Sequence, residues 1–538
     1  MSARVEASMT YPTLQLLIDG RWIGRTDAGS IEVTNPADAS VLGALPVAGP
    51  AEVEAAAAAA ARAFPGWART PPLERFRVIT KATALLRERA APMARTLTLE
   101  QGKPLAEALR EVQLSADIVD FLAEEAKRLA ARGVPPRLPS VLAQTVQRVP
   151  VGPVAAFTPW NFPANLPARK LGGALAAGCS VVIKPSEETP ATCLEIARAF
   201  TDAGLPPGVL NVVAGDPAAI SDALIAHPGI AKVSFTGSTA VGRLLGEKAA
   251  RQLKRYTSEL GGHATVIVCA DADALAVAKL SATAKYRGAG QVCASPIRFL
   301  VQRSVYPAFR DAFVAATRAL RVGGGLEEGV QVGPLIAERR VREMQAFVDD
   351  ALDQGATLLC GGERLDRPGF FYAPTALEGA PATCRVQREE PFGPIALLDA
   401  FDDLDALGAR LADQPLDLGP HDRVRVVVAQ PAQHRLRVPA GLADGGAQLA
   451  RAPRPVLALV DLVGLHRLPQ RVGLGGERAE PGQRTGGQPE QRLGLAVALE
   501  HRHAQHGAEV EQQAERAAVA QGQGGEIAHR KGFTGWPR

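Results

Sequence analysis

Hydrophobic positions change their spacing along the first 405 residues, and each change predicts a different kind of element. Residues 14–45 alternate over short runs, and Asp19-Gly20 between two apolar runs predicts a β-hairpin. Residues 51–67 and 71–127 instead follow the period of amphipathic helices. After a proline-rich interruption, residues 141–149 alternate again, as an exposed strand would.

In the middle of the chain, short apolar runs alternate with helical stretches. The runs at 154–157 and 180–183 are followed by helical stretches at 168–177 and 191–203. Repeated βα units of this length predict a parallel sheet covered by helices. The same alternation continues to about residue 405 and predicts a second α/β region.

The pattern is lost after about residue 405. Residues 411–538 contain no Asn, Met, Cys or Tyr, and they hold 13 Gln against 12 in the first 410 residues. Aromatic and β-branched residues are too few for a core, although residues 456–463 are apolar enough for one element. A flexible natural extension is one explanation. We favour a shifted, GC-rich reading frame, and expect residues 406–538 to be a non-native or disordered low-complexity tail.

Composition narrows the functional classes. A chain of 538 residues with 46% hydrophobic and 22% charged residues is typical of a globular protein of two or three domains. The net charge of +4 comes without a basic stripe, so no nucleic acid partner is expected. The chain lacks an apolar run of 18 residues, so no membrane association is expected. Six scattered cysteines without a C-x-x-C pair argue against a metal site and favour a cytoplasmic location.

A candidate nucleophile and a candidate base lie 34 residues apart. Cys293 ends Gly290-Gln291-Val292-Cys293, and Glu259 begins Glu259-Leu260-Gly261-Gly262. A thiol and a carboxylate among small residues are the groups that aldehyde oxidation through a thioester requires. The alternative for Cys293 is a buried small hydrophobe, which is the interpretation we keep for the other five cysteines.

Three turns that follow predicted strands are candidates for ligand binding. Gly237-Ser238 opens a helix whose N-terminus suits a phosphate, or it is only a structural turn. Lys184 and Glu187 are placed to hold ribose hydroxyls, unless they are only a solvated Lys and Glu on a loop. A carboxylate at Glu187 would repel a 2′-phosphate and favour NAD over NADP. Asn161 offers an amide N–H to an oxyanion, unless it is a turn-forming Asn.

Six short segments in this order and spacing resemble the NAD(P)-dependent aldehyde dehydrogenase superfamily. The segments are 158–163, 184–187, 235–239, 259–262, 290–293 and Glu390-Pro391-Phe392-Gly393-Pro394. The resemblance covers about residues 14–405 and is nearest to the succinate-semialdehyde dehydrogenase branch. The family's C-terminal ending, with its glycine-rich segment and last strand, is not found in this sequence.

The resemblance implies an α/β fold of two parallel α/β domains, a Rossmann-like cofactor domain and a catalytic domain, with a β bridging arm. The expected bounds are 14–125 and 149–258 for the NAD-binding domain, 126–148 for the bridging and oligomerisation arm, and 259–405 for an incomplete catalytic domain. The family is homo-oligomeric, and the arm implies the same for this chain, although the missing ending puts that in doubt.

The resemblance also implies a role for each site residue. Cys293 would be the nucleophile, Asn161 the oxyanion donor and Glu259 the base that activates water. The residues implied in cofactor binding are Trp160, Lys184, Ser186, Glu187, Gly237, Ser238, Glu390 and Phe392.

Two arginines suggest the substrate class. Arg169 and Arg287 match arginines that bind the distal carboxylate in succinate-semialdehyde dehydrogenases, and a guanidinium suits that task. Alternatively, either one pairs with a local acid. The expected activity is oxidation of a carboxylated semialdehyde, such as succinate semialdehyde, to the acid with NAD. The alternative is an inactive, truncated or frameshifted relative that at most binds NAD.

Overall fold

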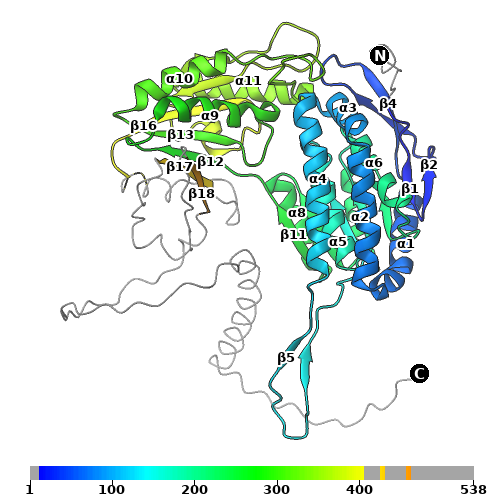
Figure 1. Cartoon of the computed structure of the whole chain (residues 1–538). Coiled ribbons are helices and arrows are strands. Elements are labelled where there is room, and N and C mark those ends of the chain that lie inside the picture. Colours follow the sequence, from blue (N-terminus) through cyan, green and yellow to red (C-terminus); the bar gives the residue numbers. More distant parts are fainter. Residues whose placement is uncertain (1–10, 405–406, 408–424, 431–455, 462–538) are drawn as a thin grey trace, which may run out of the picture. The chain divides into compact units, whose positions relative to one another are not determined.

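The computed structural model describes residues 11–404, 407, 425–430 and 456–461 (Figure 1). Within the described residues, two seven-stranded sheets divide the chain, the first ending at Glu259 and the second beginning at Ala264. Each sheet has its own hydrophobic core. This arrangement confirms the predicted aldehyde-dehydrogenase-like α/β class.

The first sheet has the order β11-β10-β7-β8-β9-β1-β2, in which the first five strands run parallel. Its strands are β1 (Leu16–Ile18), β2 (Arg21–Ile23), β7 (Val154–Phe157), β8 (Val181–Lys184), β9 (Leu210–Val212), β10 (Lys232–Thr236) and β11 (Arg255–Glu259). β3 (Ser30–Thr34) and β4 (Val41–Pro46) form a separate antiparallel pair.

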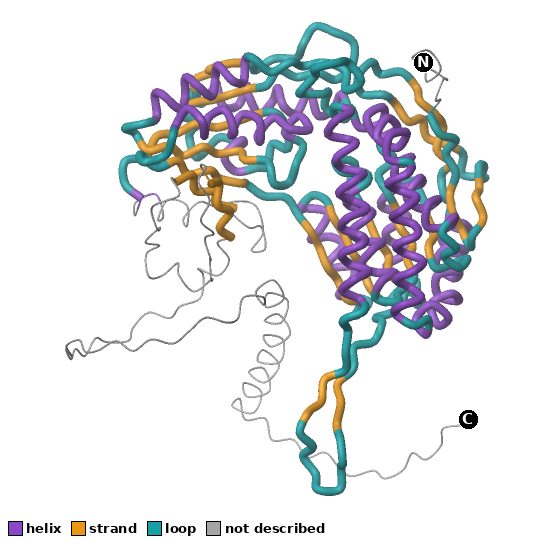
Figure 2. The backbone as a smooth tube through the Cα atoms, viewed as in Figure 1, coloured by secondary structure: helices purple, strands orange, loops and turns teal. Residues whose placement is uncertain are grey.

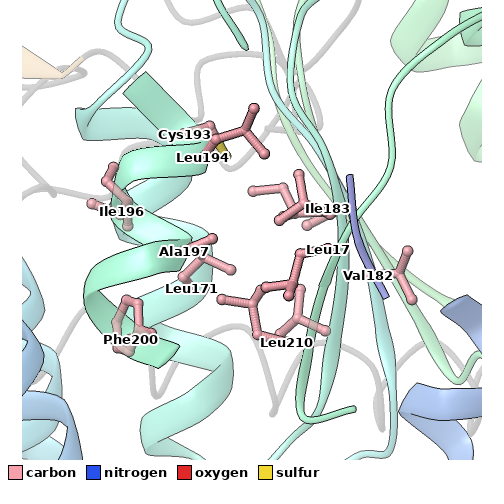
Figure 3. Close-up of a cluster of buried hydrophobic side chains, with 14 of the residues drawn as sticks. Leu17, Leu171, Val182, Ile183, Cys193, Leu194, Ile196, Ala197, Phe200 and Leu210 are labelled. Carbon is pink, nitrogen blue, oxygen red and sulfur yellow. The ribbon is translucent and has the colours of Figure 1, made fainter. Parts of the chain in front are cut away.

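Eight helices accompany the first sheet. They are α1 (Pro50–Arg69), α2 (Pro72–Glu88), α3 (Ala90–Gln101), α4 (Leu105–Ala126), α5 (Asn165–Ala176), α6 (Pro190–Asp202), α7 (Pro217–Ala226) and α8 (Thr239–Arg251). Figure 3 shows how α6 packs: Ile183 and Leu210 of the sheet point toward Phe200 of the helix, whereas Val182 points to the opposite face. This alternation is the two-residue period of a strand that is buried on both faces.

The predicted hairpin at Asp19-Gly20 is confirmed. Ile18 pairs with Arg21, so the loop has two residues. Both loop residues have positive φ, 52° for Asp19 and 77° for Gly20, as a type I′ turn requires.

A second hairpin, β5 (Arg132–Val134) with β6 (Gln144–Val146), forms a two-stranded sheet of its own (Figure 2). It falls within the segment expected to be the bridging arm, and β6 lies within the predicted exposed strand. From residue 127 to 149 every residue is exposed except Val134, which is half-buried.

The second sheet has the order β14-β15-β16-β13-β12-β17-β18. Its strands are β12 (Ala264–Val268), β13 (Pro296–Gln302), β14 (Thr357–Cys360), β15 (Thr375–Glu378), β16 (Ile395–Phe401), β17 (Arg425–Gln430) and β18 (Val456–Asp461). β17 pairs in parallel with β12, and β18 pairs antiparallel with β17. β18 lies within the apolar run predicted at 456–463, whereas β17 was not predicted. The rest of the tail lies outside the described residues.

The second core is built around phenylalanines. The elements that supply it besides the sheet are α9 (Ala274–Tyr286), the 3₁₀ turn η1 (Arg287–Gly290), α10 (Tyr306–Arg318), α11 (Glu338–Asp353) and α12 (Arg385–Arg388). Phe299 of β13 and Phe313 of α10 have ring centroids 4.9 Å apart, and Phe309 lies 5.8 Å from Phe313. All three rings are fully buried, so this aromatic cluster fastens α10 to the sheet.

No helix in the described part of the chain is both long and apolar enough to cross a membrane. Nor do the described residues gather three or more His, Cys, Asp or Glu side chains that could hold a metal ion.

Truncation of the aromatic cluster tests its contribution to stability. Phe313→Ala should lower the free energy of unfolding by about 3–5 kcal/mol, because a fully buried ring is lost and a cavity remains. Phe121→Ala is the matched control, since that ring is 63% exposed on α4 and its loss should change stability by less than about 0.5 kcal/mol. Chemical denaturation measures both. Equal effects of the two substitutions would contradict the packing described here.

Candidate active site

Four of the predicted segments lie at one edge of the first sheet. The neighbouring parallel strands β11, β10, β7 and β8 end at Glu259, Thr236, Phe157 and Lys184. Parallel strands point the same way, so the turns that follow them share the carboxyl edge of the sheet. The chain order reverses at β7, whose neighbours are β8 and β10, and such a switch point is where open α/β sheets bind ligands.

The remaining two predicted segments, together with 259–262, lie at the amino edge of the second sheet. β12, β13 and β16 are adjacent and parallel, and they begin at Ala264, Pro296 and Ile395. Segments 259–262, 290–293 and 390–394 immediately precede these strands. Parallel pairing therefore brings together three segments that are far apart in the sequence.

Two contacts join these edges. The Asn161 side-chain amide donates a hydrogen bond of 3.0 Å to the backbone carbonyl of Gln291, two residues before Cys293. The Trp160 and Phe392 rings meet edge to face, with centroids 5.6 Å apart and an interplanar angle of 85°. The turn after β7 is thus packed against both the cysteine segment and the segment before β16.

Glycines allow the segments of the second edge to approach closely. A Cβ on Gly261 would lie 1.9 Å from Oε2 of Glu390, and a Cβ on Gly290 would lie 2.2 Å from the carbonyl oxygen of Gly393. Neither position has room for a side chain. The carboxylate of Glu390 therefore lies against the backbone of Gly261, two residues after Glu259.

Backbone strain is concentrated at the same place. Gly288, Ala289 and Gly290 have φ values of 56°, 56° and 71°, so the chain is left-handed for three residues just before the cysteine segment. Phe392 has φ of 46°. Left-handed conformations of Ala and Phe persist only where the surroundings enforce them, and they occur preferentially at functional sites.

Cys293 differs from the other five cysteines in its exposure. Its side chain is exposed, whereas Cys179, Cys193, Cys269, Cys360 and Cys384 are buried. Burial raises the pKa of all five buried thiols, which keeps them protonated and unreactive. The chain thus presents one accessible thiol, and it lies three residues after the strained turn at 288–290.

Glu259 is exposed at the end of β11 and has a lysine in its neighbourhood. Lys170 of α5 donates a hydrogen bond of 3.0 Å to Ser234 Oγ. Burial lowers the pKa of Lys170 to about 8, and the charge of Glu259 opposes that lowering. The carboxylate and the lysine are therefore electrostatically coupled.

The turn after β8 is held by ion pairs and hydrogen bonds. Lys184 is buried and forms an ion pair with Glu187. It also donates a hydrogen bond of 3.1 Å to the backbone carbonyl of Pro185. Ser186 donates to Glu188, which also pairs with Arg339 of α11. The Lys184 ammonium and the Glu187 carboxylate are thereby fixed at the carboxyl edge.

The turn after β10 is an exposed helix N-terminus. Ser238 caps α8 by accepting a hydrogen bond from the backbone N–H of Val241. The backbone N–H of Gly237 donates a hydrogen bond of 3.1 Å to the carbonyl of Glu259. The helix is 13 residues long, and its N-terminus opens at the same edge as Lys184. An anionic group at this edge would meet the positive end of the helix dipole.

The two predicted substrate arginines are exposed and have local neighbours. Arg169 donates a hydrogen bond of 2.8 Å to Oδ1 of Asn165, which lies one turn earlier on α5. Arg287 lies 6.0 Å from the Phe162 ring, and its charge acts on Glu107. Burial raises the pKa of Glu107, against the charges of Lys103 and Arg287. Local acidic pairing of Arg287, one of the alternatives, therefore has a candidate partner.

Comparison with known proteins identifies the family. The profile described as the aldehyde dehydrogenase family matches residues 22–415. The chain belongs to the aldehyde dehydrogenase family. As such it is an oxidoreductase that acts on a small-molecule aldehyde with NAD or NADP. A match of this extent does not favour the alternative of an inactive relative.

The relatives of this aldehyde dehydrogenase include enzymes of anionic substrates. It is 43% identical over 451 residues to a putative 4-(hydroxymethyl)benzenesulfonate dehydrogenase of Comamonas testosteroni, covering 83% of this chain and 93% of the relative. It is 42% identical over 389 residues to the NADP(+) succinate-semialdehyde dehydrogenase of Escherichia coli, and the match covers 72% of this chain and 80% of the relative. The crystal structure of succinate-semialdehyde dehydrogenase from Burkholderia pseudomallei superimposes with a TM-score of 0.72 at 43% identity. The superposition covers 74% of this chain and 83% of that chain.

Three charged residues of the site were missed in the sequence. Lys170 follows Arg169 directly but was given no role. Lys103 falls within residues 71–127, which were predicted as helix, whereas the structure breaks the helix there between α3 and α4. Glu111 gave the one usable signal, because it shares a helix face with Ala108, Val112 and Ser115, which are buried. A carboxylate on an apolar face requires a buried partner.

The pKa of Lys170 makes stability depend on pH. Its value falls from the usual 10.5 to about 8 on folding, so between these values the native state has released a proton that the unfolded state still holds. Stability must then rise with pH across this window. Relative to Lys170→Met, the wild type should gain about 1–3 kcal/mol in free energy of unfolding between pH 8 and 10.5.

Denaturant titrations at several pH values measure this difference. Lys279→Met, at an exposed lysine of α9, is the control and should differ from the wild type by the same amount at every pH. A difference between wild type and Lys170→Met that does not vary with pH would refute the coupling.

Proposed function

We propose that this chain oxidises an aldehyde carrying a distal anionic group, with succinate semialdehyde as the representative substrate, to the acid, using NAD. The observation that carries the proposal is the exposed thiol of Cys293, which lies two residues after the Gln291 carbonyl that accepts a hydrogen bond from the amide of Asn161. This pairing suits attack on a carbonyl carbon with the oxygen held by donors.

In the proposed reaction, the Cys293 sulfur attacks the aldehyde carbon and forms a thiohemiacetal. One N–H of Asn161 is bonded to Gln291, and its second N–H is available to the developing oxyanion. The bound dinucleotide supplies a hydride acceptor. Loss of hydride from the substrate carbon leaves a thioester on Cys293.

Glu259 is proposed to activate the water that hydrolyses this thioester. Its carboxylate is exposed, so it has access to solvent, and it is electrostatically coupled to Lys170. General-base assistance of this kind contributes about 10²–10⁴-fold. Hydrolysis by water, rather than transfer to a thiol acceptor such as CoA, is the outcome that Glu259 favours.

Exposed guanidinium groups at Arg169 and Arg287 support an anionic substrate. Each is a bidentate donor for a carboxylate or a sulfonate. The relatives' names include succinate-semialdehyde, glutarate-semialdehyde and 3-sulfolactaldehyde dehydrogenases, all of which act on aldehydes with a distal anion.

Steady-state NADH formation with succinate semialdehyde tests the activity and the substrate class together. Arg169→Met and Arg287→Met should each raise KM for succinate semialdehyde by about 10–100-fold, because a charged hydrogen bond is lost. KM for butanal, which lacks the carboxylate, should change less than about threefold. Cys293→Ala should form no NADH and serves as the blank.

Two outcomes would contradict the proposal in different ways. Absence of wild-type turnover with any anionic aldehyde, despite dinucleotide binding, would revive the inactive-relative hypothesis. If the arginine variants raise KM for succinate semialdehyde and for butanal by the same factor, these residues have no selective role.

The carboxyl edge of the first sheet fits a dinucleotide. Within the described residues, Thr158 Oγ1 and Asn161 Oδ1 are buried there without a hydrogen-bond partner, beside the open N-terminus of α8. We assign Lys184 and Glu187 to the adenosine ribose, with Ser186 and Trp160 nearby. Gly237 and Ser238 would lie by the pyrophosphate, and Glu390 and Phe392 by the nicotinamide ribose and ring. The Glu187 carboxylate favours NAD, whereas the Escherichia coli relative is named for NADP(+).

Neutralising Glu187 tests the cofactor preference. Glu187→Gln should raise kcat/KM for NADP relative to NAD by about tenfold, since a charge that repels the 2′-phosphate is removed. Glu188→Gln is the matched control, because it removes the same charge from the neighbouring carboxylate, which pairs with Arg339 and has no assigned contact with the ribose. Similar ratios in the two variants, or a stronger NAD preference in Glu187→Gln, would contradict the assignment.

The exposed hairpin β5–β6 supports a homo-oligomer. Leu142 is fully exposed, and Val149 is 75% exposed at the base of the hairpin. Apolar side chains on an isolated two-stranded ribbon are typical of a surface that pairs with another chain. A cytoplasmic location, expected from the scattered cysteines, belongs to the same proposal.

A further inference from the structure

Two buried charged residues in the first α/β region have no part in the chemistry described above. Lys103, in the joint between α3 and α4, is 4% exposed, and Glu111, in the second turn of α4, is 5% exposed. Lys103 Nζ lies 2.5 Å from Glu111 Oε2, so the two form a buried ion pair. A charge pair removed from water requires further partners, and these partners indicate its purpose.

The partners of the pair belong to the turn that carries Asn161. Lys103 Nζ donates a hydrogen bond of 2.8 Å to the backbone carbonyl of Asn161 itself. Glu111 Oε1 accepts from the backbone N–H groups of Ala164 and Asn165, at 3.0 and 3.1 Å. The pair is therefore hydrogen-bonded to the turn at residue 161 and again at the start of α5.

The side chain of the same asparagine faces the other way. Its amide reaches the carbonyl of Gln291, and its backbone carbonyl is held by Lys103. Since both ends of Asn161 are engaged, a shift of Lys103 would move the amide relative to the Cys293 segment. The Lys103 ammonium also lies 4.3 Å from the centre of the Phe162 ring, which fixes the next residue of the turn.

We propose that the Lys103–Glu111 pair is a positioning device that sets the Asn161 amide at the distance from Cys293 at which it stabilises the oxyanion. The inference rests on the proposed function, because Asn161 matters in this way only if an aldehyde reacts at Cys293. Neither Lys103 nor Glu111 touches substrate. They act through the backbone of the turn between β7 and α5.

A purely structural role is the competing explanation. A buried ion pair is weak evidence for stability, because an apolar pair of similar volume often stabilises as well. Here three hydrogen bonds from the pair converge on one turn, including the bond to the carbonyl of Asn161, whose amide faces the cysteine segment. A pair that served only to stabilise α4 would not need to bond residue 161.

A double-mutant cycle between Lys103 and Asn161 separates the two explanations. Asn161→Ala should lower kcat/KM for the aldehyde by about 10²–10³-fold, as loss of one oxyanion donor does. Lys103→Met should lower it by about 10–10²-fold, since a misplaced donor loses most of its effect. If Lys103 acts through Asn161, the double variant should be within about threefold of Asn161→Ala alone.

Three further measurements accompany the cycle. In Lys103→Met, KM for NAD and the rate of iodoacetamide alkylation of Cys293 should stay within about twofold of wild type. Glu111→Gln keeps the volume and one acceptor oxygen, so it provides a second, milder cycle with the same non-additive outcome. Thr83→Val removes a part-buried hydrogen bond to α4, the 2.6 Å contact with Asp120, and should leave kcat/KM unchanged.

A multiplicative double variant, about 10³–10⁵-fold below wild type, would overturn the positioning role while leaving the proposed function intact. So would a loss in Thr83→Val equal to that in Lys103→Met, or a parallel loss of NAD binding and thiol reactivity. Failure of the wild type to oxidise the aldehyde would instead overturn the proposed function on which the inference rests.

Discussion

Parallel pairing of strands is the constraint on which the rest of this enzyme depends. In the first sheet it gathers the carboxyl ends of β7, β8, β10 and β11, and in the second it gathers the amino ends of β12, β13 and β16. Each segment with a candidate role adjoins one of these strand ends. Because the backbone hydrogen bonds of a parallel ladder fix the register, the ends of neighbouring strands cannot slide apart without loss of the core.

The segments at the second edge meet more tightly than ordinary side chains allow. Gly261 admits the Glu390 carboxylate, and Gly290 admits the backbone of Gly393. The left-handed Ala289 and Phe392 lie within the same segments. Strain of this kind persists only because both flanking elements are packed into the phenylalanine core, so the stability of the second α/β region maintains the geometry around Cys293.

A strand that is buried on both faces was predictable from its apolar run, whereas the edge strand β11 was not. The run at 154–157 matches β7, because a fully buried strand is apolar throughout. Arg255–Glu259 was missed because an edge strand with alternating exposure carries few apolar residues, and only pairing with β10 makes it a strand. β17 was missed for another reason: its β-branched run lies in a tail whose composition argues against a core.

The sequence by itself determined the family and the two α/β regions and supplied the candidate residues of the site, because short motifs and local periodicity lie in neighbouring positions. Only the tertiary structure decided which residues support them. Lys103, Glu111 and Lys170 have no motif, since their roles come from burial and from partners 58, 53 and 64 residues away. The electrostatics of a buried charge depend on what surrounds it in space, and a linear pattern does not contain that information.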